Sequence, residues 1–177
     1  MSIVLPFGKR QTTAEIDWNA LYAEHIGSVF NFFRYRTGDD QLAQDLTATT
    51  FEKAWKRRRQ FCSDPEAFVG WLYAIARNVA TDHFRKRPNL VALDEVKALA
   101  QQDDVSDTVA QRLEFSRLVC YINNLSSRER DLIVLKYGAE LNNRQIATQL
   151  GLSESNVGSI LHRTVHKLRQ QMEQSDG

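Results

Sequence analysis

Hydrophobic residues recur with a helical period along most of the chain, and no segment alternates apolar and polar residues as a half-buried strand does. In the first half, apolar stripes cover residues 21–33, 42–55 and 68–79. The three prolines, at positions 6, 65 and 88, lie outside these stripes, so they interrupt none of them. The pattern therefore predicts an all-α protein.

The pattern breaks once, between residues 88 and 107, where the sequence is acidic, contains glutamines and carries no sustained apolar stripe. Helical periodicity resumes near Thr108. Upstream, Ser63, Pro65 and Glu66 indicate a helix start, because they supply a cap, a first-turn proline and an early acid. We expect two small helical domains joined by a flexible acidic linker. The predicted divisions are a disordered tail over 1–16, a first domain over 17–87, a linker over 88–109, a second domain over 110–171 and a tail over 172–177.

Three capping signals divide the second domain into short helices. Ser126 and Glu129 have the spacing of a capping box, and the helix that they open ends at Gly138. Asn142 is placed to cap the next helix and Ser153 to cap the last one.

The last two of these helices carry the pattern of a helix-turn-helix. Ala147 is small where two helices cross, Gly151 permits the positive φ of a tight turn, and Val157 and Ile160 are spaced to pack back under the first helix. This combination favours a DNA-binding helix-turn-helix over an unrelated helical hairpin.

The last helix is then the recognition helix, with its first residues directed at base edges. Asn156 and Ser159 can donate and accept hydrogen bonds there, whereas Arg163 and Lys167 suit phosphates. The residues predicted to contact this DNA are Ser155, Asn156, Ser159, His162, Arg163 and Lys167.

Two features of this helix also have plainer interpretations. Lys167 and Arg169 equally suit the C-terminal end of any helix. His162 and His166 are four residues apart, but no third ligand is apparent, so we expect no metal site.

The net charge of +1 says little about partners, but its distribution is uneven. Residues 53–87 contain nine basic and three acidic side chains, whereas residues 88–114 contain two basic and six acidic ones. A basic block beside an acidic one favours a polyanion-binding surface, with two oppositely charged solvated faces as the alternative.

Several classes of protein are not indicated. The chain has no paired-carboxylate site, metal constellation, phosphate-binding loop or nucleophile motif, so we expect no catalytic residues and no cofactor. Cys62 and Cys120 are isolated, which fits the reducing cytoplasm. No apolar run is long enough to span a bilayer, and the N-terminus lacks the order of a secretory signal.

Taken together, the motifs resemble the extracytoplasmic-function (group 4) sigma factors of the sigma-70 family. The segments that resemble region 2 of that family are Leu21-Tyr22 through Phe33, Thr37-Gly38-Asp39, Ala43-Gln44-Asp45-Leu46, Thr50-Phe51, Trp55, residues 68–78, and Asp82, Phe84, Arg85 and Lys86. Leu125 to Glu129 and the helix-turn-helix resemble region 4. The resemblance covers roughly 17–87 and 110–171, in the family's order.

The resemblance implies a division of labour. Region 2 would dock on the clamp of the largest subunit of core RNA polymerase and open the −10 promoter element, and region 4 would recognise the −35 element and touch the flap of the second-largest subunit. It also implies an anti-sigma factor as a partner. The residues implied for core polymerase are Asp45, Leu46, Phe51 and Trp55. Those implied for the −10 element are Arg77, Asn78, Asp82, Arg85 and Lys86.

The spacing of the −10 residues partly supports this assignment. Asn78, Asp82 and Arg85 share a helix face beside the buried stripe, although the same geometry permits a plain Asp82–Arg85 ion pair. Basic residues over 56–59 and 85–87 would suit a melted strand. Trp71 and Tyr73 are candidates for stacking on its bases, with Trp71 better suited to the core.

The sequence departs from the family at two places. Ala48 and Thr49 stand where the family often has glutamine and glutamate, and Gly158 and Ile160 stand where the recognition helix commonly has basic residues. The family's −35 contacts therefore do not transfer to this chain. The rival hypothesis is a self-sufficient helix-turn-helix regulator with a sensing or dimerising N-terminal domain, which would bind palindromic duplexes without core polymerase.

Overall fold

The computed structural model describes residues 17–61, 65–86 and 107–175. The predicted N-terminal tail and residues 88–106 of the predicted linker lie outside these ranges, as do Ser63 and the last two residues. The described part of the chain is helical and contains no strand, which confirms the all-α prediction.

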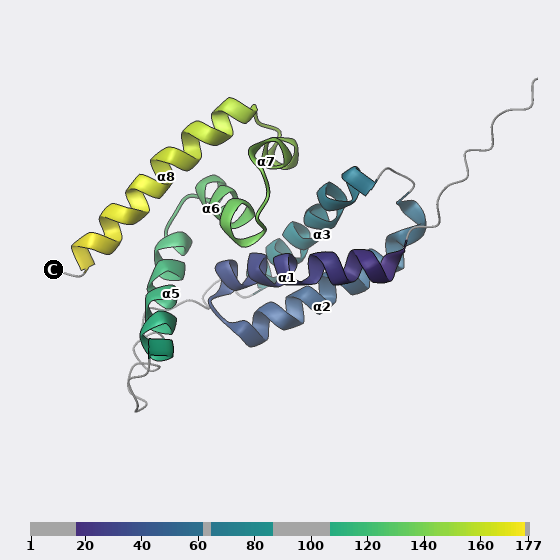
Figure 1. The fold of residues 1–177 in the computed structure, drawn as a ribbon, viewed down its shortest axis with the longest axis horizontal. Coiled ribbons are helices and arrows are strands. Elements are labelled where there is room, and N and C mark those ends of the chain that lie inside the picture. Colours follow the sequence, from purple (N-terminus) through teal and green to yellow (C-terminus); the bar gives the residue numbers. More distant parts are fainter. Residues whose placement is uncertain (1–16, 62–64, 87–106, 176–177) are drawn as a thin grey trace, which may run out of the picture.

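The first region is built from three long helices and a short 3-10 turn. They are α1 (Trp18–Thr37), α2 (Asp40–Arg57), η1 (Arg58–Gln60) and α3 (Pro65–Lys86). The second region is built from shorter helices and one long final helix. They are α5 (Asp107–Asn123), α6 (Ser127–Ile133), η2 (Val134–Gly138), α7 (Asn143–Leu150) and α8 (Glu154–Ser175). The segment η2, which directly follows α6, packs on α1. Figure 1 shows α8 along the outer side of the second region.

The turns that join α1 to α2 and α7 to α8 both depend on glycine. Gly38 follows α1 with φ 71°, and Gly151 follows α7 with φ 64°, which is the left-handed conformation that glycine adopts without steric cost. Asp39 then caps α2 by accepting the backbone N–H of Leu42 at 3.0 Å. The φ of 64° at Gly151 confirms the positive φ that the sequence predicts for this turn.

The predicted caps of the second region are also present. Ser126 and Glu129 form the reciprocal capping box at the start of α6, and Asn142 forms another with Gln145 at the start of α7. The Ser153 hydroxyl accepts the backbone N–H of Asn156 at 3.2 Å and so caps α8.

The two regions share one continuous hydrophobic core. Phe33, Phe68 and Leu72 form its centre in the first region, and Leu135 and Ile146 belong to it in the second. The sequence predicts two domains joined by a linker, and it does not predict that they share buried side chains.

The close approach of η2 to α1 depends on Gly138, which is needed for the space that its missing Cβ leaves. A Cβ added to Gly138 would lie 3.1 Å from the carbonyl oxygen of Asn31 and 3.1 Å from the Cα of Phe32. Gly138 therefore allows the backbone of the second region to pack directly on the backbone of the first.

Candidate nucleic-acid interface

The exposed face of α3 carries the residues predicted for the −10 element. Asn78 and Arg85 are exposed, and Asp82 is half-buried between them. The Asp82 carboxylate lies 3.2 Å from Nη2 of Arg85 and 3.9 Å from Nζ of Lys53 on α2. The Asp82–Arg85 ion pair considered from the spacing is thus present, while the Asn78 amide makes this face polar without an ion pair.

Arg77 points elsewhere. Its Nη1 donates to the carbonyl oxygen of Gln149 on α7 at 2.9 Å, and its Nη2 lies 3.4 Å from the carboxylate of Asp131 on α6. Of the predicted −10 set, the structure therefore groups Asn78, Asp82 and Arg85, adds the exposed Lys86 at the end of α3, and directs Arg77 into the contact between the regions.

The two side chains considered for stacking are not free. Tyr73 is 1% exposed, and burial raises the pKa of its phenol to about 12. Trp71 is part of an aromatic cluster in which its ring centroid lies 5.1 Å from that of Phe61. The exposed aromatic rings of the first region are Tyr22, at 47%, and Trp55, at 51%.

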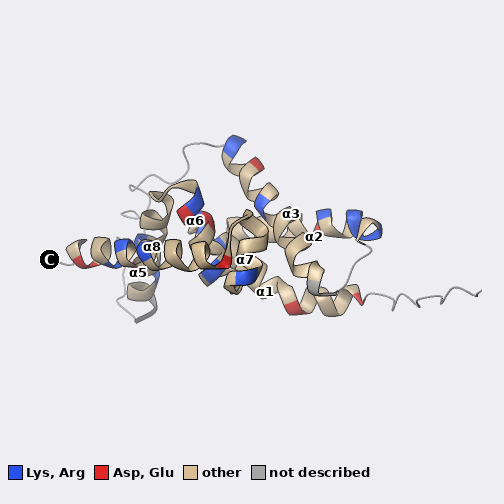
Figure 2. Cartoon of the chain, turned by 90° about the horizontal axis from the view of Figure 1, so that it is seen from above, with Lys and Arg blue, Asp and Glu red and all other residues tan. Residues whose placement is uncertain are grey.

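Basic side chains gather at the end of α2, in η1 and at the end of α3 (Figure 2). Arg58 is held against Trp55, because its Nη1 donates to the Trp55 carbonyl oxygen at 2.8 Å and its guanidinium lies 3.9 Å from the centre of the Trp55 ring. Lys56 pairs with Glu52 one turn earlier. The predicted basic track is thus partly anchored by local contacts.

The recognition helix α8 presents all of its predicted DNA contacts. Ser155, Asn156, Ser159, His162, Arg163 and Lys167 are exposed. Val157 and Leu161 are buried beneath them. Near the middle of the helix, Lys167 lies 3.9 Å from Glu129, whose pKa is lowered by the Ser126 hydroxyl and, to a smaller extent, by Lys167.

The two departures from the family's recognition helix face the protein body. A Cβ on Gly158 would lie 3.7 Å from the Nδ2 of Asn143 on α7, and Ile160 packs against the hydrophobic core. Both positions thus belong to the side of α8 that faces the other helices. Neither of them is among the exposed residues predicted to contact DNA.

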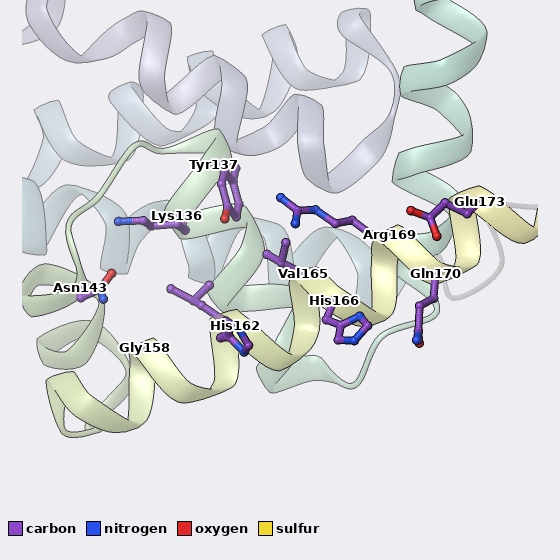
Figure 3. Close-up of a pocket in the computed structure, with 11 residues that line it drawn as sticks. Lys136, Tyr137, Asn143, Gly158, His162, Val165, His166, Arg169, Gln170 and Glu173 are labelled. Carbon is purple, nitrogen blue, oxygen red and sulfur yellow. The ribbon is translucent and has the colours of Figure 1, made fainter.

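A groove of about 630 Å³ runs between η2 and α8 (Figure 3). Leu161 and Val165 provide its apolar surface, and Lys136, His166 and Arg169 lie around it. Tyr137, which is 48% exposed, stands on the η2 side. The groove therefore has a mixed lining, in which Tyr137 and Val165 are apolar, Lys136 and Arg169 are basic, and Asn143, Gln170 and Glu173 are polar or acidic.

Of the residues predicted for core polymerase, Phe51 and Trp55 line one cleft, whereas Asp45 and Leu46 lie apart from it. Asp45 is exposed on α2, whereas Leu46 is 7% exposed and belongs to the core. Phe51 is half-buried, with its ring centroid 4.8 Å from that of Tyr22, and Trp55 is exposed near the end of the helix. Leu46 therefore packs in the core, and the exposed Asp45 lies outside the cleft that Phe51 and Trp55 line.

In the ranges that the structure describes, no helix is both long and apolar enough to cross a membrane.

Comparison with known proteins agrees with this arrangement. Residues 21–88 match the family model for Sigma-70 region 2, and residues 121–170 match the one for Sigma-70, region 4. The ECF RNA polymerase sigma factor SigL of Mycobacterium tuberculosis is 30% identical over 152 residues, which cover 85% of each chain. The chain belongs to the ECF sigma factors of the sigma-70 family. It is therefore a sigma factor for promoter-specific transcription, and a self-sufficient regulator is not favoured.

Two further similarities place this sigma factor among its relatives. The ECF sigma factor BldN of Streptomyces coelicolor is 26% identical over 164 residues, which are 90% of this chain and 62% of BldN, so the chain spans less than two thirds of that relative. The co-crystal structure of the sigma factor RpoE with the anti-sigma factor NepR from Bartonella quintana is similar in fold. Its TM-score is 0.61 at 21% identity, covering 91% of this chain and 99% of RpoE.

Proposed function

We propose that this sigma factor binds core RNA polymerase and positions two DNA-recognising surfaces, α8 for the −35 element and the exposed face of α3 for the −10 element. The observation that carries this proposal is the row of exposed polar side chains on α8, the second helix of a helix-turn-helix whose first helix is capped and whose turn has Gly151 at φ 64°. The protein itself performs no covalent chemistry in this scheme.

Short polar side chains at the start of α8 would contact the bases of the −35 element. Ser155, Asn156 and Ser159 are exposed on the first two turns of α8, where a recognition helix enters the major groove. Asparagine can form a bidentate hydrogen-bonded pair with adenine, and serine can bond to any base edge. Arg163 lies one turn further on and would contact a phosphate.

Recognition of the −10 element rests chiefly on Asn78. The Asp82 carboxylate is already shared by Lys53 and Arg85, which leaves the Asn78 amide as the free hydrogen-bonding group of this face. Arg85 and Lys86 are exposed and would neutralise the backbone of the opened strand. Unstacking a base costs a few kcal/mol, so contacts to the extruded base would stabilise the opened state.

Core polymerase would be bound at two places. The exposed face of α2 around Asp45 would meet the clamp of the largest subunit. The groove between η2 and α8 would receive a segment of the flap of the second-largest subunit, because the exposed Tyr137 and the half-buried Val165 offer apolar surface there between polar side chains. Two weak sites on one chain gain from effective concentration.

An anti-sigma factor is the further partner that we propose. The support is the similarity in fold to RpoE, which was crystallised with the anti-sigma factor NepR. Such a partner would act by covering the polymerase-binding surfaces or by holding regions 2 and 4 together.

The decisive experiment is run-off transcription with purified core polymerase on a genomic promoter library. We expect the chain to bind core and to start RNA synthesis at a defined set of promoters. A chain that binds a palindromic duplex by itself and leaves transcription by core unchanged would support the regulator hypothesis instead.

A narrower experiment tests Asn78. The Asn78→Ala variant should form the open complex roughly 5- to 150-fold more slowly while binding core normally, since a base contact is worth about 1–3 kcal/mol. Asn124→Ala, at an exposed asparagine between α5 and α6, is the matched control and should behave as the wild type. Equal losses of core binding and open-complex formation would contradict the assigned role.

A further inference from the structure

The helices of region 2 and those of the second region contact each other at several places. The segment η2 packs on the backbone of α1, and α7 packs on α3. The helix α5 also lies on α1, where the ring centroids of Tyr35 and Phe115 are 5.2 Å apart and the Arg34 guanidinium lies 4.3 Å from the centre of the Phe115 ring. Side chains and backbone of this one chain thus join the two regions.

The polar part of this contact connects four helices. The Asp131 carboxylate of α6 lies 3.3 Å from Arg36 of α1 and 3.4 Å from Arg77 of α3. Gln149 of α7 donates to the Gly70 carbonyl of α3 at 2.6 Å, and its own carbonyl oxygen accepts from Arg77 at 2.9 Å. We call these five residues the inter-region lock. Because the Arg36 side chain is 13% exposed and that of Asp131 28%, salt screens the lock less than it screens a surface pair.

The lock keeps the two proposed DNA surfaces close together. Arg77 comes directly before Asn78 of the −10 face, and Gln149 comes seven residues before Asn156 of the −35 row. Seven residues span at most about 25 Å when fully extended, so with one arginine side chain and one hydrogen bond the path from Asn78 to Asn156 is at most roughly 40 Å.

A promoter separates its two elements by much more. The −10 and −35 elements are named by their positions, so they are about 25 base pairs apart, which is about 85 Å of duplex at roughly 3.4 Å per base pair. Duplex DNA is stiff over about 150 base pairs, so bringing the elements within roughly 40 Å of each other would require a sharp and costly bend. The closed arrangement therefore does not hold both elements of a straight promoter at once.

We propose that the inter-region lock is an autoinhibitory contact, which keeps the free chain closed and which core RNA polymerase breaks when it binds. The inference rests on the proposed function, because it concerns the same two DNA surfaces. The free energy of opening weakens the apparent affinity for core, because only the open fraction of the chains is competent to bind. Asp131 and Gln149 then set the affinity for core, although neither belongs to a surface assigned to polymerase or DNA.

The first test weakens the lock without changing a binding surface. Gln149→Ala removes the hydrogen bond to Gly70 and should bind purified core about fivefold more tightly than the wild type does, which is the equivalent of one hydrogen bond. Gln111→Ala, at an exposed glutamine of α5, is the matched control and should bind as the wild type does. Damage to the fold would weaken binding instead. If Gln149→Ala has the circular dichroism of the wild type but binds core no more tightly, the lock is not autoinhibitory.

The second test fixes the closed arrangement. A Cβ added to Gly70 would lie 3.2 Å from Nε2 of Gln149, so Gly70→Cys and Gln149→Cys place two thiols within reach of a short bis-methanethiosulfonate cross-linker. Cys62→Ser and Cys120→Ala remove the native thiols from the same chain. The linked chain should start RNA synthesis with core at least about tenfold more slowly than the same sample after dithiothreitol has removed the link, because only the open chain is competent.

The outcomes separate this inference from the proposed function. Transcription by the wild type with core tests the sigma factor assignment, whatever the linked chain does. If the linked chain starts RNA synthesis as fast as the released chain, the contact between the regions does not inhibit and the inference is wrong. If the linked chain loses core binding and regains it on reduction, core binding requires the lock to open.

Discussion

Two arginines of α3 show how the neighbouring residue decides the role of a side chain. Arg85 is exposed and pairs with Asp82 one turn earlier, so it stays at the surface where DNA would pass. Arg77 lies on the same helix but donates to the Gln149 carbonyl and faces Asp131. Both are predicted to meet the −10 element, and the structure directs Arg77 toward region 4 and leaves Arg85 exposed beside Asn78.

Tyr73 gives a prediction at the same scale. Burial raises its pKa to about 12 from 10.0, so between these values the unfolded chain loses the phenolic proton while the folded protein keeps it. The unfolded state then binds fewer protons, and the free energy of unfolding falls as the pH rises through this window. Below pH 10 this contribution is fully present.

The Tyr73→Phe variant has no phenolic proton to lose, so it should lack this fall in the free energy of unfolding at high pH. From pH 9 to 12, the wild type should lose roughly 2 kcal/mol more of its free energy of unfolding than the variant does, as a two-unit pKa difference implies. Urea unfolding at a series of pH values measures the difference, with circular dichroism at pH 7 as the control for the fold. Parallel pH profiles for the two proteins would contradict the prediction.

At the scale of the element, the effect of a glycine on stability depends on which atoms lie near its Cα. Gly138 is at the point where η2 meets the backbone of α1, and Gly158 is inside α8 with only the Asn143 amide nearby. The first is needed for a close approach, whereas the second only weakens its helix.

Alanine at these two positions should therefore have opposite effects. Gly138→Ala forces η2 away from Asn31 and Phe32 and should lower the free energy of unfolding by about 1–3 kcal/mol, the usual cost of overpacking. Gly158→Ala should raise it by about 0.5–1 kcal/mol, because alanine favours the helix. Urea unfolding measures both. Equal stabilisation by both substitutions would show that η2 can move away from α1 without cost.

At the scale of the molecule, an ion-pair cluster joins the two regions. The Asp131 carboxylate lies 3.3 Å from Arg36 and 3.4 Å from Arg77, and Gln149 donates to the Gly70 carbonyl at 2.6 Å. Burial lowers the pKa of the Arg36 guanidinium, and Asp131 opposes that effect. In this arrangement, Arg77 contacts Asp131 of region 4.

Asp131→Asn should loosen the contact between the regions. The substitution leaves two guanidinium groups facing each other without a counter-charge, which is costly where they are partly buried. We expect the radius of gyration from small-angle X-ray scattering to increase. Asp40→Asn is the control, because Asp40 pairs with Arg34 inside region 2 at 2.9 Å. If both variants stay as compact as the wild type, the apolar contacts of η2 with α1 hold the regions together without the ion pairs.

The sequence alone determined the helical segments, the caps at Ser126, Asn142 and Ser153 and the turn at Gly151, because each depends on residues only a few positions apart. It also indicated the exposed row on α8, since helical periodicity separates that row from Val157 and Leu161. The burial of Leu46 follows from the same rule and was obscured by the family resemblance.

Only the tertiary structure decided which side chains from distant segments meet. It directed Arg77 toward Asp131 and Gln149, brought Gly138 against α1, and joined Trp55 to Trp18 in one cleft. Periodicity assigns a residue to a face of its own helix but does not say which helix covers that face. That choice depends on how all the apolar faces are buried together, and here it produced a contact between regions 2 and 4 and an aromatic cleft that no local pattern predicts.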